Sequence, residues 1–342
     1  MATSDGALLI WAPATACKTG LLVQRLGADG SAPRAPIAID PACGGGEIVE
    51  VAAASGGGRL GIAFIVEDKG ARRARVLGTY ASDSGEAFAP VLPLGAAEPT
   101  GRAARGRLEL VATESGQMRI GWQAPRAACV GDTGSCAQIL SEPYPPPSDP
   151  IERRTDTREI PQPCERFLTG SVWTGGVWYD GFCALDRSSV PTTQVYSIRP
   201  EISYAEVDPT LQDCEPLGLS PSAAGAVAWG RCADGLAAHF LAPEGRRQIV
   251  RNAERTLECA EGRPSLRLHG SQQTGEALPL RAPRDRLEGW LPASLASDDA
   301  RAAFTGRDLL VAAPEAGHLV VTSHHCESQR LVSDVGGTRP ML

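Results

Sequence analysis

The segment Ala226-Val227-Ala228-Trp229-Gly230-Arg231-Cys232 combines a short apolar run, a tryptophan and a closing cysteine. Four other cysteines, Cys17, Cys129, Cys183 and Cys326, also follow short apolar runs. Four of the five runs carry a tryptophan at a comparable place: Trp11, Trp122, Trp178 and Trp229. A recurring phrase of this kind is typical of a repeat architecture. Runs of about four to eight residues have the length of β-strands.

The rest of the chain continues this rhythm of short apolar runs bounded by Gly, Pro, Asp or Ser. The turns between them are rich in glycine, as at Gly56-Gly57-Gly58 and Gly175-Gly176. Helical character is confined to Leu291 to Phe304, which is rich in Ala and Leu. Many short strands joined by turns indicate an all-β sandwich, barrel or propeller.

Spacing between cysteines predicts two stapled hairpins. The midpoint of Cys214 and Cys232 falls at Ala223, and that of Cys164 and Cys183 falls beside Gly175-Gly176. In an antiparallel hairpin the start of the first strand lies beside the end of the second. Each pair therefore closes the open end of one hairpin, which favours blades of a propeller held by local staples. Elimination adds three further pairs: Cys17–Cys43, Cys129–Cys136 and Cys259–Cys326.

Ten cysteines with no Cys-x-x-Cys phrase predict disulfides rather than metal sites. Disulfides in turn predict an oxidising compartment: the periplasm, the cell surface or the secreted space. Met1 to Gly6 has no basic region followed by an apolar one, so we expect that any signal peptide has been cut away. No run of about 18 apolar residues occurs, and no membrane span is expected.

We expect a β-propeller of seven blades, with six as the alternative count. The predicted blades are 6–41, 43–95, 106–142, 164–208, 214–258, 262–295 and 306–334. The first and last segments each supply only three strands. Because natural sheets avoid unpaired edges, we expect strands from the two termini to pair and close the ring.

The segment Glu142 to Pro163 interrupts the strand rhythm with Pro143-Tyr144-Pro145-Pro146-Pro147 and a charged run. We interpret 143–163 as an extended, proline-rich crossing between blades, within a single domain of residues 1–342. A two-domain chain hinged at this crossing is the alternative.

One turn resembles a known motif. Ala81-Ser82-Asp83-Ser84-Gly85-Glu86-Ala87-Phe88 is similar to the Asp-box of sialidase-like (BNR-like) propellers, a phrase in which Asp83, Gly85 and Phe88 shape the turn. The resemblance implies that Asp83 accepts backbone N–H groups, that Gly85 takes a positive φ, and that Phe88 anchors the turn. Ala87 stands where the family often has Thr, and one clear copy is present. Gln24 to Gly30 likewise resembles a strand-to-turn phrase of bacterial propellers.

Catalytic signals are weak. The early Arg-Ile-Pro element of sialidases is missing, and Ser197-Ile198-Arg199-Pro200 comes too late in the chain to replace it. Asp132-Thr133-Gly134 matches the aspartic-protease triplet, but the carboxylate pair needs a second copy in a matching half. The triplet lies between Cys129 and Cys136, which favours a turn pinned by a disulfide.

Metal and cofactor signals are also weak. His324-His325-Cys326 is the only histidine cluster in the sequence, and neighbouring residues on a strand point to opposite faces. Calcium-loop, phosphate-loop and dinucleotide phrases do not occur. We therefore expect no metal and no cofactor. The recurring tryptophans could form a carbohydrate platform, but their matching repeat positions favour a core role.

The net charge of −7 and the pI near 5.4 argue against a nucleic-acid partner. Basic clusters such as Arg102 to Arg107 are short, and we expect them to be solvated. We expect a non-catalytic exported binding or scaffold protein that recognises another protein or a glycan through its loops. The alternative is an exported hydrolase or lyase acting on a glycan or peptide, with carboxylates and arginines gathered at the mouth of the central channel.

Overall fold

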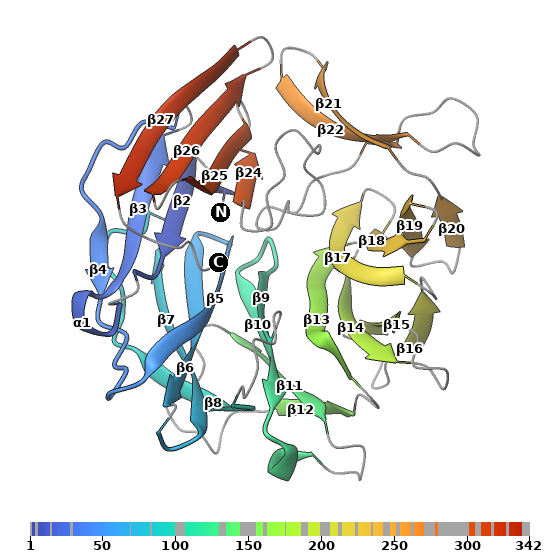
Figure 1. The fold of residues 1–342 in the computed structure, drawn as a ribbon, viewed down its shortest axis with the longest axis horizontal. Helices are drawn as coiled ribbons and strands as arrows, with labels where there is room; N and C mark the ends of the chain where they lie inside the picture. Colours follow the sequence, from blue (N-terminus) through green and yellow to red (C-terminus); the bar gives the residue numbers. More distant parts are fainter. Residues whose placement is uncertain are drawn as a thin grey trace.

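A computed structural model gives the structure of the chain. It describes residues 2–336 apart from 4–5, 14–15, 28–29, 69, 83, 100–106, 130–134, 144–154, 160–162, 175, 186–190, 199–205, 211–213, 223–224, 234, 242–246, 251–253, 261–262, 270–277, 280–300, 305–308, 316–317 and 326–327. The described strands form seven antiparallel sheets, each built from strands consecutive in the chain. The sheets follow one another around a ring in sequence order (Figure 1). The fold is a seven-bladed β-propeller.

The first four blades cover the N-terminal part of the chain. Blade 1 contains β1 (Ala2–Thr3), β2 (Gly6–Trp11), β3 (Leu21–Gly27) and β4 (Ile37–Ile39), with α1 (Ala16–Thr19) after β2. Blade 2 contains β5 (Glu47–Gly56), β6 (Arg59–Asp68), β7 (Arg73–Ser82) and β8 (Leu92–Ala97). Blade 3 contains β9 (Leu108–Ala112), β10 (Gln117–Ala124), the 3₁₀ turn η1 (Arg126–Ala128), β11 (Cys136–Pro143) and β12 (Thr155–Glu159). Blade 4 contains β13 (Pro163–Thr174), β14 (Val177–Leu185), β15 (Pro191–Ile198) and β16 (Glu206–Thr210).

Three further blades complete the ring. Blade 5 contains β17 (Cys214–Ser222), β18 (Gly225–Cys232), β19 (Gly235–Leu241) and β20 (Arg247–Val250). Blade 6 contains β21 (Glu254–Ala260), β22 (Arg263–His269) and β23 (Leu278–Pro279). Blade 7 contains β24 (Arg301–Phe304), β25 (Leu309–Glu315), β26 (His318–His325) and β27 (Ser328–Gly336).

The second strand of a blade is covered on both faces. All six residues of β2 are buried, and β6 is buried along its length except at Arg59 and Asp68. A strand with two buried faces is expected to be a near-continuous apolar run. The recurring tryptophans lie on these second strands and are at most 4% exposed, so the structure places them in the core.

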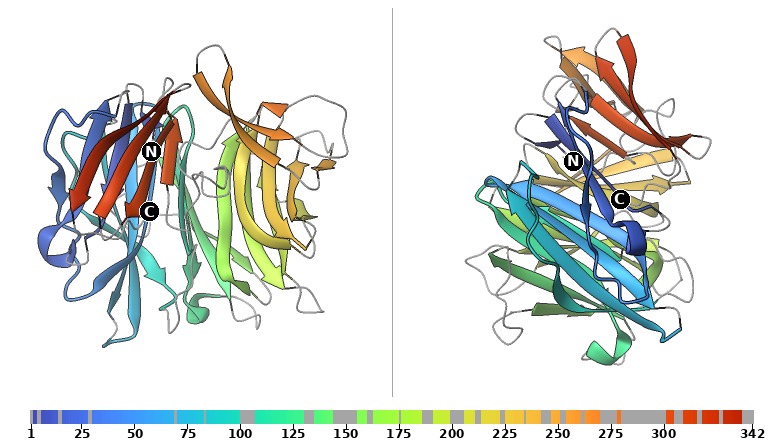
Figure 2. Two further views of the ribbon diagram at one scale, coloured as in Figure 1. Left: turned by 45° about the horizontal axis from the view of Figure 1, so that its top comes forward. Right: turned by 90° about the vertical axis from the view of Figure 1, so that its left-hand side faces the viewer.

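Ring closure differs from the sequence prediction. No described sheet combines strands from both ends of the chain, so the expected pairing of N- and C-terminal strands is wrong. The prediction failed because two short strands were overlooked. Ala2–Thr3 adds β1 to blade 1, and Arg301–Phe304, expected to have helical character, adds β24 to blade 7. Side views place the two end blades next to each other (Figure 2).

Two blade boundaries also shift. The segment 143–163, expected to be an extended crossing, contains β12, the outer strand of blade 3, which pairs with β11. Blade 5 ends with β20, and the strand that carries Cys259 belongs to blade 6 rather than to blade 5. In both cases a short polar outer strand carried too weak an apolar pattern to be recognised.

Three of the five predicted disulfides are described, and all three have the expected partners: Cys17–Cys43, Cys129–Cys136 and Cys214–Cys232. The last joins residues that pair directly across β17 and β18, as the hairpin argument requires. Cys183 is also disulfide-bonded, and Pro163 pairs with Ala184, which brings the backbone of Cys164 beside Cys183. The Cys164 side chain and the Cys259–Cys326 pair lie outside the described residues.

Candidate functional site

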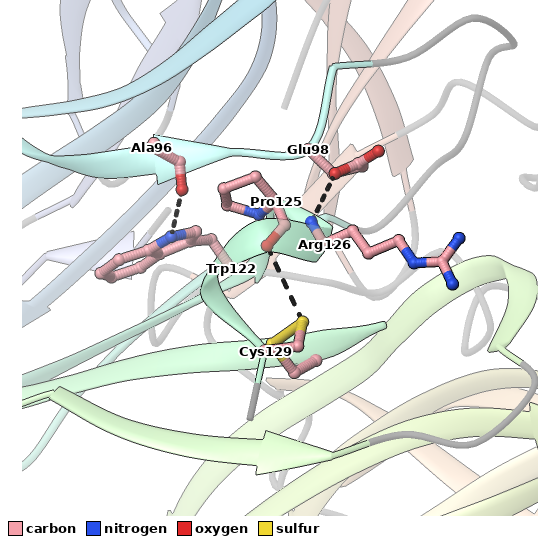
Figure 3. The surroundings of a disulfide bond; sticks show 7 residues. Ala96, Glu98, Trp122, Pro125, Arg126 and Cys129 are labelled. Atoms are coloured by element: carbon pink, nitrogen blue, oxygen red, sulfur yellow. Dashed lines mark hydrogen bonds between the residues drawn. A yellow bond between two sulfur atoms is a disulfide. The ribbon is translucent and has the colours of Figure 1, made fainter. Parts of the chain in front are cut away.

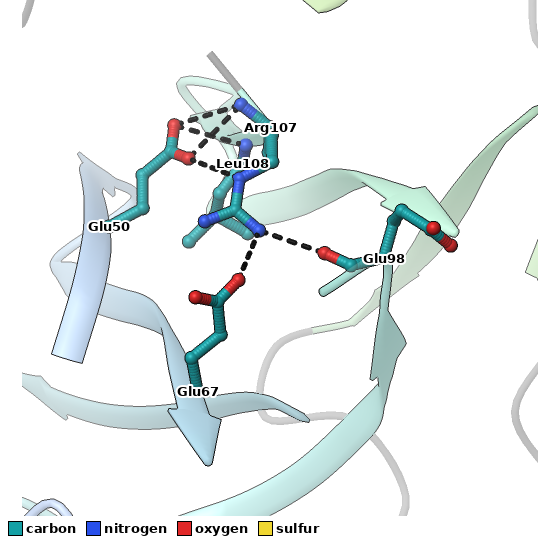
Figure 4. Close-up of polar contacts among 5 residues, drawn as sticks. All are labelled: Glu50, Glu67, Glu98, Arg107 and Leu108. Carbon is teal, nitrogen blue, oxygen red and sulfur yellow. Dashed lines mark hydrogen bonds and ion pairs between the residues drawn. The ribbon is translucent and has the colours of Figure 1, made fainter. Parts of the chain in front are cut away.

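A buried arginine joins blades 2 and 3 (Figure 4). Arg107 immediately precedes β9 and is 2% exposed, although the sequence suggested a solvated basic cluster there. Its Nη1 donates to Glu67 Oε1 at 3.1 Å and to the Glu98 carbonyl oxygen at 2.9 Å. The backbone N–H of Arg107 donates to Glu50 Oε1 at 2.9 Å, and its Nε lies 3.7 Å from Glu50 Oε2.

A β-bulge places Glu50 in this cluster. The pairing of β5 with β6 shifts register between Ile48 and Glu50. An extra residue in one strand re-aims the side chains that follow it. The Glu50 carboxylate then accepts hydrogen bonds from the backbone N–H groups of both Arg107 and Leu108, the second at 3.2 Å. The cluster therefore fixes the start of β9 against blade 2.

A second buried ion pair joins blades 3 and 4. Arg119 in β10 and Asp180 in β14 are 3% and 1% exposed, and Arg119 Nη2 lies 2.7 Å from Asp180 Oδ2. Ser171 donates to Asp180 Oδ1 at 3.0 Å, and the Arg119 guanidinium lies 5.5 Å from the ring centroid of Trp178. Arginine is suited to such sites because its planar cation stacks on aromatic rings and pairs with carboxylates.

Trp122 shows how a core tryptophan reaches the preceding blade (Figure 3). Its indole Nε1 donates to the Ala96 carbonyl oxygen of β8 at 3.0 Å. An ideal Cβ on Gly95 would lie 2.6 Å from Trp122 Cζ2, so the glycine leaves room for the ring. Beyond β10, the backbone N–H of Arg126 donates to the Glu98 carboxylate at 3.0 Å, and the Cys129 sulfur lies 3.8 Å from the Pro125 carbonyl oxygen.

The turn that resembles an Asp-box connects β7 with β8. Gly85 has φ +64° and donates its N–H to the Ser82 carbonyl oxygen at 2.9 Å, as expected for a tight turn. Phe88 forms a β-bridge with Ala81 and packs against the core cluster between blades 1 and 2. Asp83 lies outside the described residues, so its role stays a prediction.

The histidine cluster predicted from the sequence is described in part. His324 in β26 is buried, burial lowers its pKa below the ordinary value of 6.5, and its Nε2 lies 3.0 Å from the Thr322 hydroxyl. Because the unfolded chain takes up this proton more readily, acidification below about pH 6.5 favours unfolding through this group.

The structure locates two further sequence candidates, Ser197 and Ile198, at the end of β15. The Asp132-Thr133-Gly134 triplet, Arg199, Pro200 and Cys326 lie outside the described residues.

Within the described residues, no group of three or more His, Cys, Asp or Glu side chains is arranged to hold a metal ion. The same part of the chain contains no helix long and apolar enough to span a membrane. The Arg107 cluster and the Arg119–Asp180 pair lie between blades, and the charges within each are paired with one another. Their chemistry is that of neutralised interior charges, which hold neighbouring sheets together.

Comparison with known proteins identifies the fold but neither a sequence family nor a function. No family model and no curated protein match the sequence. A candidate 6-phosphogluconolactonase from Bacteroides uniformis superposes with a TM-score of 0.57 and 11% identity, covering 99% of each chain. A second candidate from Bacteroides fragilis gives 0.53 and 10%, covering 99% of this chain and 97% of that one. The chain is similar in fold to known β-propellers.

A third similarity is to a prolyl endopeptidase structure, with a TM-score of 0.55 and 10% identity. It covers 93% of this chain and 46% of that one. At these identities the similarity concerns the backbone arrangement alone, since one propeller fold carries many unrelated functions.

Proposed function

We propose that the protein is a non-catalytic, exported binding or scaffold protein that recognises another protein or a glycan through the loops of its propeller. A propeller is a rigid support whose loops all gather on two faces, where sequence variation alters recognition without altering the core. Function then depends on the loops between blade strands rather than on a catalytic cluster.

One observation carries the proposal: the buried ion pairs described in blades 2 to 4 are used between blades. Arg107 binds Glu50 and Glu67, and Arg119 binds Asp180, with both arginines at most 3% exposed. A hydrolase or lyase would need carboxylates and arginines held open toward a substrate. Arginines that hold sheets together fit a rigid support better.

Export is the second part of the proposal. Three disulfides in the described part of the chain indicate an oxidising location outside the cytoplasm. We place the protein in the periplasm, on the cell surface or in the secreted space.

The turn from Ser82 to Phe88 supports a resemblance to the turns of sialidase-like propellers. The resemblance concerns the structure of the turn and not its chemistry.

A paired binding and turnover assay tests the proposal. The intact, oxidised protein is presented to an array of bacterial and host glycans and to a panel of purified surface proteins. Hits are then incubated with the protein, and the mixture is followed by mass spectrometry. We expect saturable binding with the ligand recovered unchanged.

Two outcomes would count against a binding role. Release of a cleaved product at a rate that depends on protein concentration would favour the hydrolase or lyase. Binding that is equally strong with heat-unfolded protein would show that the propeller surface is not the recognition element.

A further inference from the structure

Four basic side chains lie at one end of blades 1 and 2. Lys18 is in α1, which follows β2, and Arg72, Arg73 and Arg75 lie in the turn from β6 to β7 or at the start of β7. Because β2 and β6 are the second strands of their blades, the antiparallel order puts the connections that follow them at the same end of the ring. All four side chains are exposed, and we call them the basic patch.

A short series of contacts joins Arg75 to the segment that carries Lys18. Arg75 Nη2 donates to the Cys43 carbonyl oxygen at 2.6 Å, and Cys43 is disulfide-bonded to Cys17, the neighbour of Lys18 in the sequence. An ideal Cβ on Gly44 would lie 3.4 Å from the same Nη2, so the guanidinium lies against the connection between the two blades. The disulfide and this hydrogen bond therefore hold the two segments side by side.

The turn before β7 holds Arg72 in a strained backbone conformation. Arg72 has φ +49°, in the left-handed region that residues other than glycine seldom adopt. Asp68 fixes the turn, because its Oδ1 accepts hydrogen bonds from the backbone N–H groups of Gly70 at 3.0 Å and Ala71 at 3.1 Å. Glycine would take the position of Arg72 without strain, so an arginine there indicates a role for its side chain.

Arg72 and Arg73 are cations without an acidic partner. Neither makes an ion pair or a side-chain hydrogen bond with any residue that the structure describes. Asp68 directs its Oδ1 to the backbone of the turn, and Asp40, in the connection between blades 1 and 2, accepts the backbone N–H of Ala42 at 2.9 Å. The basic patch is therefore a positive surface on a chain whose net charge is −7, and such a surface attracts anions.

The surroundings of the basic patch limit the kind of partner. A guanidinium presents its N–H groups as a planar fork that matches the oxygens of a carboxylate or a similar oxyanion. Protein interfaces usually have an apolar centre that is rich in aromatic side chains. In the segments 16–20, 40–47 and 70–75, no exposed apolar side chain is larger than alanine. The basic patch therefore fits a partner that offers repeated negative charges and needs no apolar surface.

We propose that the basic patch binds an acidic glycan, a polysaccharide that carries carboxylate or sulfate groups. This proposal rests on the proposed binding function and adds to it the place of contact and the charge of the ligand. Arg72 and Arg73 pair with anionic groups of the glycan, and Lys18 and Arg75 contact further groups along the same chain. A repeated anion suits such a surface, because each exposed ion pair is weak by itself and several on one ligand act together.

Titration with defined polymers tests the proposal. The intact, oxidised protein is titrated by calorimetry with polygalacturonate, dextran sulfate, neutral dextran and polyglutamate. We expect saturable binding of at least one acidic glycan, no binding of dextran, and affinity that falls as salt is added, because exposed charges are screened. Polyglutamate should bind at least about tenfold more weakly, since a flexible peptide loses more conformational freedom than a chain of sugar rings.

Two sets of variants test the residues. Arg72→Gln combined with Arg73→Gln should weaken glycan binding at least about tenfold, since it removes both unpaired cations. The matched control is Arg34→Gln combined with Arg59→Gln, which removes the same charge from exposed positions at the opposite end of blades 1 and 2 and should leave binding unchanged. Arg72→Gly also removes a cation but relieves the positive φ, so it should bind more weakly without a lower melting temperature.

Lysine acetylation gives the place of contact independently of affinity. The chain contains only two lysines: Lys18 in the basic patch, and Lys69, which stands between Asp68 and Gly70 in the sequence. Peptide mass spectrometry follows their acetylation with and without polygalacturonate or dextran sulfate, whichever binds. We expect the bound glycan to slow the acetylation of Lys18.

The outcomes separate this proposal from the proposed function. Glycan binding that is unchanged in the Arg72, Arg73 double variant would overturn the proposal and leave the binding function intact, because the ligand would then bind elsewhere. Polyglutamate binding as tight as that of the glycans, or binding of neither acidic glycan, would also overturn it. If the wider array of glycans and proteins gives no ligand at all, the binding function itself is wrong.

Discussion

Gly95 is a residue whose lack of a side chain matters to a neighbouring blade. It lies in β8, where an added Cβ would meet Trp122 Cζ2 at 2.6 Å. The buried Trp122 ring has little room to move away from a methyl group added at Gly95, because protein interiors are close-packed. The contact also holds Trp122 near the Ala96 carbonyl oxygen that its N–H binds.

We predict that Gly95→Ala lowers the free energy of unfolding by about 1–3 kcal/mol, as overpacking does elsewhere. Urea unfolding measures the change. Gly121→Ala is the matched control, since its added Cβ would lie 3.9 Å from Ile139, an ordinary contact distance. Equal stability of the two alanine variants would show that the indole can move and that Gly95 is not required for space.

The sequence predicted strands and tryptophans well and predicted buried charges poorly. Trp122 and Trp229 were recognisable because an apolar strand surrounds each of them. Arg107 was misinterpreted as solvated, because the residues that bury it lie far away in the sequence: Glu50 is 57 positions distant. A β-bulge then decides where Glu50 points, and a bulge leaves almost no sequence signal.

At the scale of elements, an ion pair links β10 to β14. Removing one partner of a buried pair leaves the other charge without compensation, which costs more than removing both. If Arg119 were removed, Ser171 would still donate to the buried Asp180 carboxylate, but its charge would be uncompensated, and Trp178 would lose the guanidinium that lies over its ring.

We predict that Arg119→Met lowers stability by about 3–5 kcal/mol, the usual cost of breaking a buried pair. The double variant Arg119→Met, Asp180→Asn should lose less than the single variant, because it leaves no buried charge. Thermal and urea unfolding of the three variants, including Asp180→Asn alone, give the coupling between the two residues. A double variant less stable than Arg119→Met would contradict the prediction.

The disulfides link elements that are close in the chain, as Cys214–Cys232 links β17 to β18. We predict that non-reducing peptide mapping finds Cys183 bonded to Cys164, as the pairing of Pro163 with Ala184 suggests, and Cys214 bonded to Cys232. Replacing Cys214 and Cys232 together with Ser should cost about 2–4 kcal/mol, as is usual for removing a native disulfide. A peptide that links Cys183 to any cysteine other than Cys164 would refute the hairpin argument for blade 4.

Blade number could be predicted from the sequence because the second strands of blades 1 to 5 and of blade 7 are short apolar runs. Ring closure could not, because it depended on β1 and β24, strands of only two and four residues, the second of them within a stretch interpreted as helical. The buried charge clusters could not be predicted from the sequence either, since they form only when blades 2, 3 and 4 pack together. Local patterns thus predict the blades, and the contacts between blades require the structure.

At the scale of the whole molecule, β2 contacts both neighbours of blade 1. Leu8 and Ile10 belong to the cluster shared with blade 2, whereas Leu9 and Trp11 belong to the cluster shared with blade 7. We predict that deleting Met1 to Pro13 unfolds the propeller cooperatively. Four large buried side chains contribute about 1.5–3 kcal/mol each. Their sum is comparable to the whole stability of a domain, about 5–15 kcal/mol.

Calorimetry of the truncated and full chains measures the effect, and we expect the single transition of the full chain to disappear or to move far down in temperature. Deletion of Gly337 to Leu342, which lies beyond β27, is the control for loss of a terminus and should change little. Blades 3 and 4 pack together through Arg119 and Asp180, so a failure of blade 1 should spread past residue 163. A truncated chain whose C-terminal half still melts at the original temperature would instead indicate two independent domains divided at 143–163.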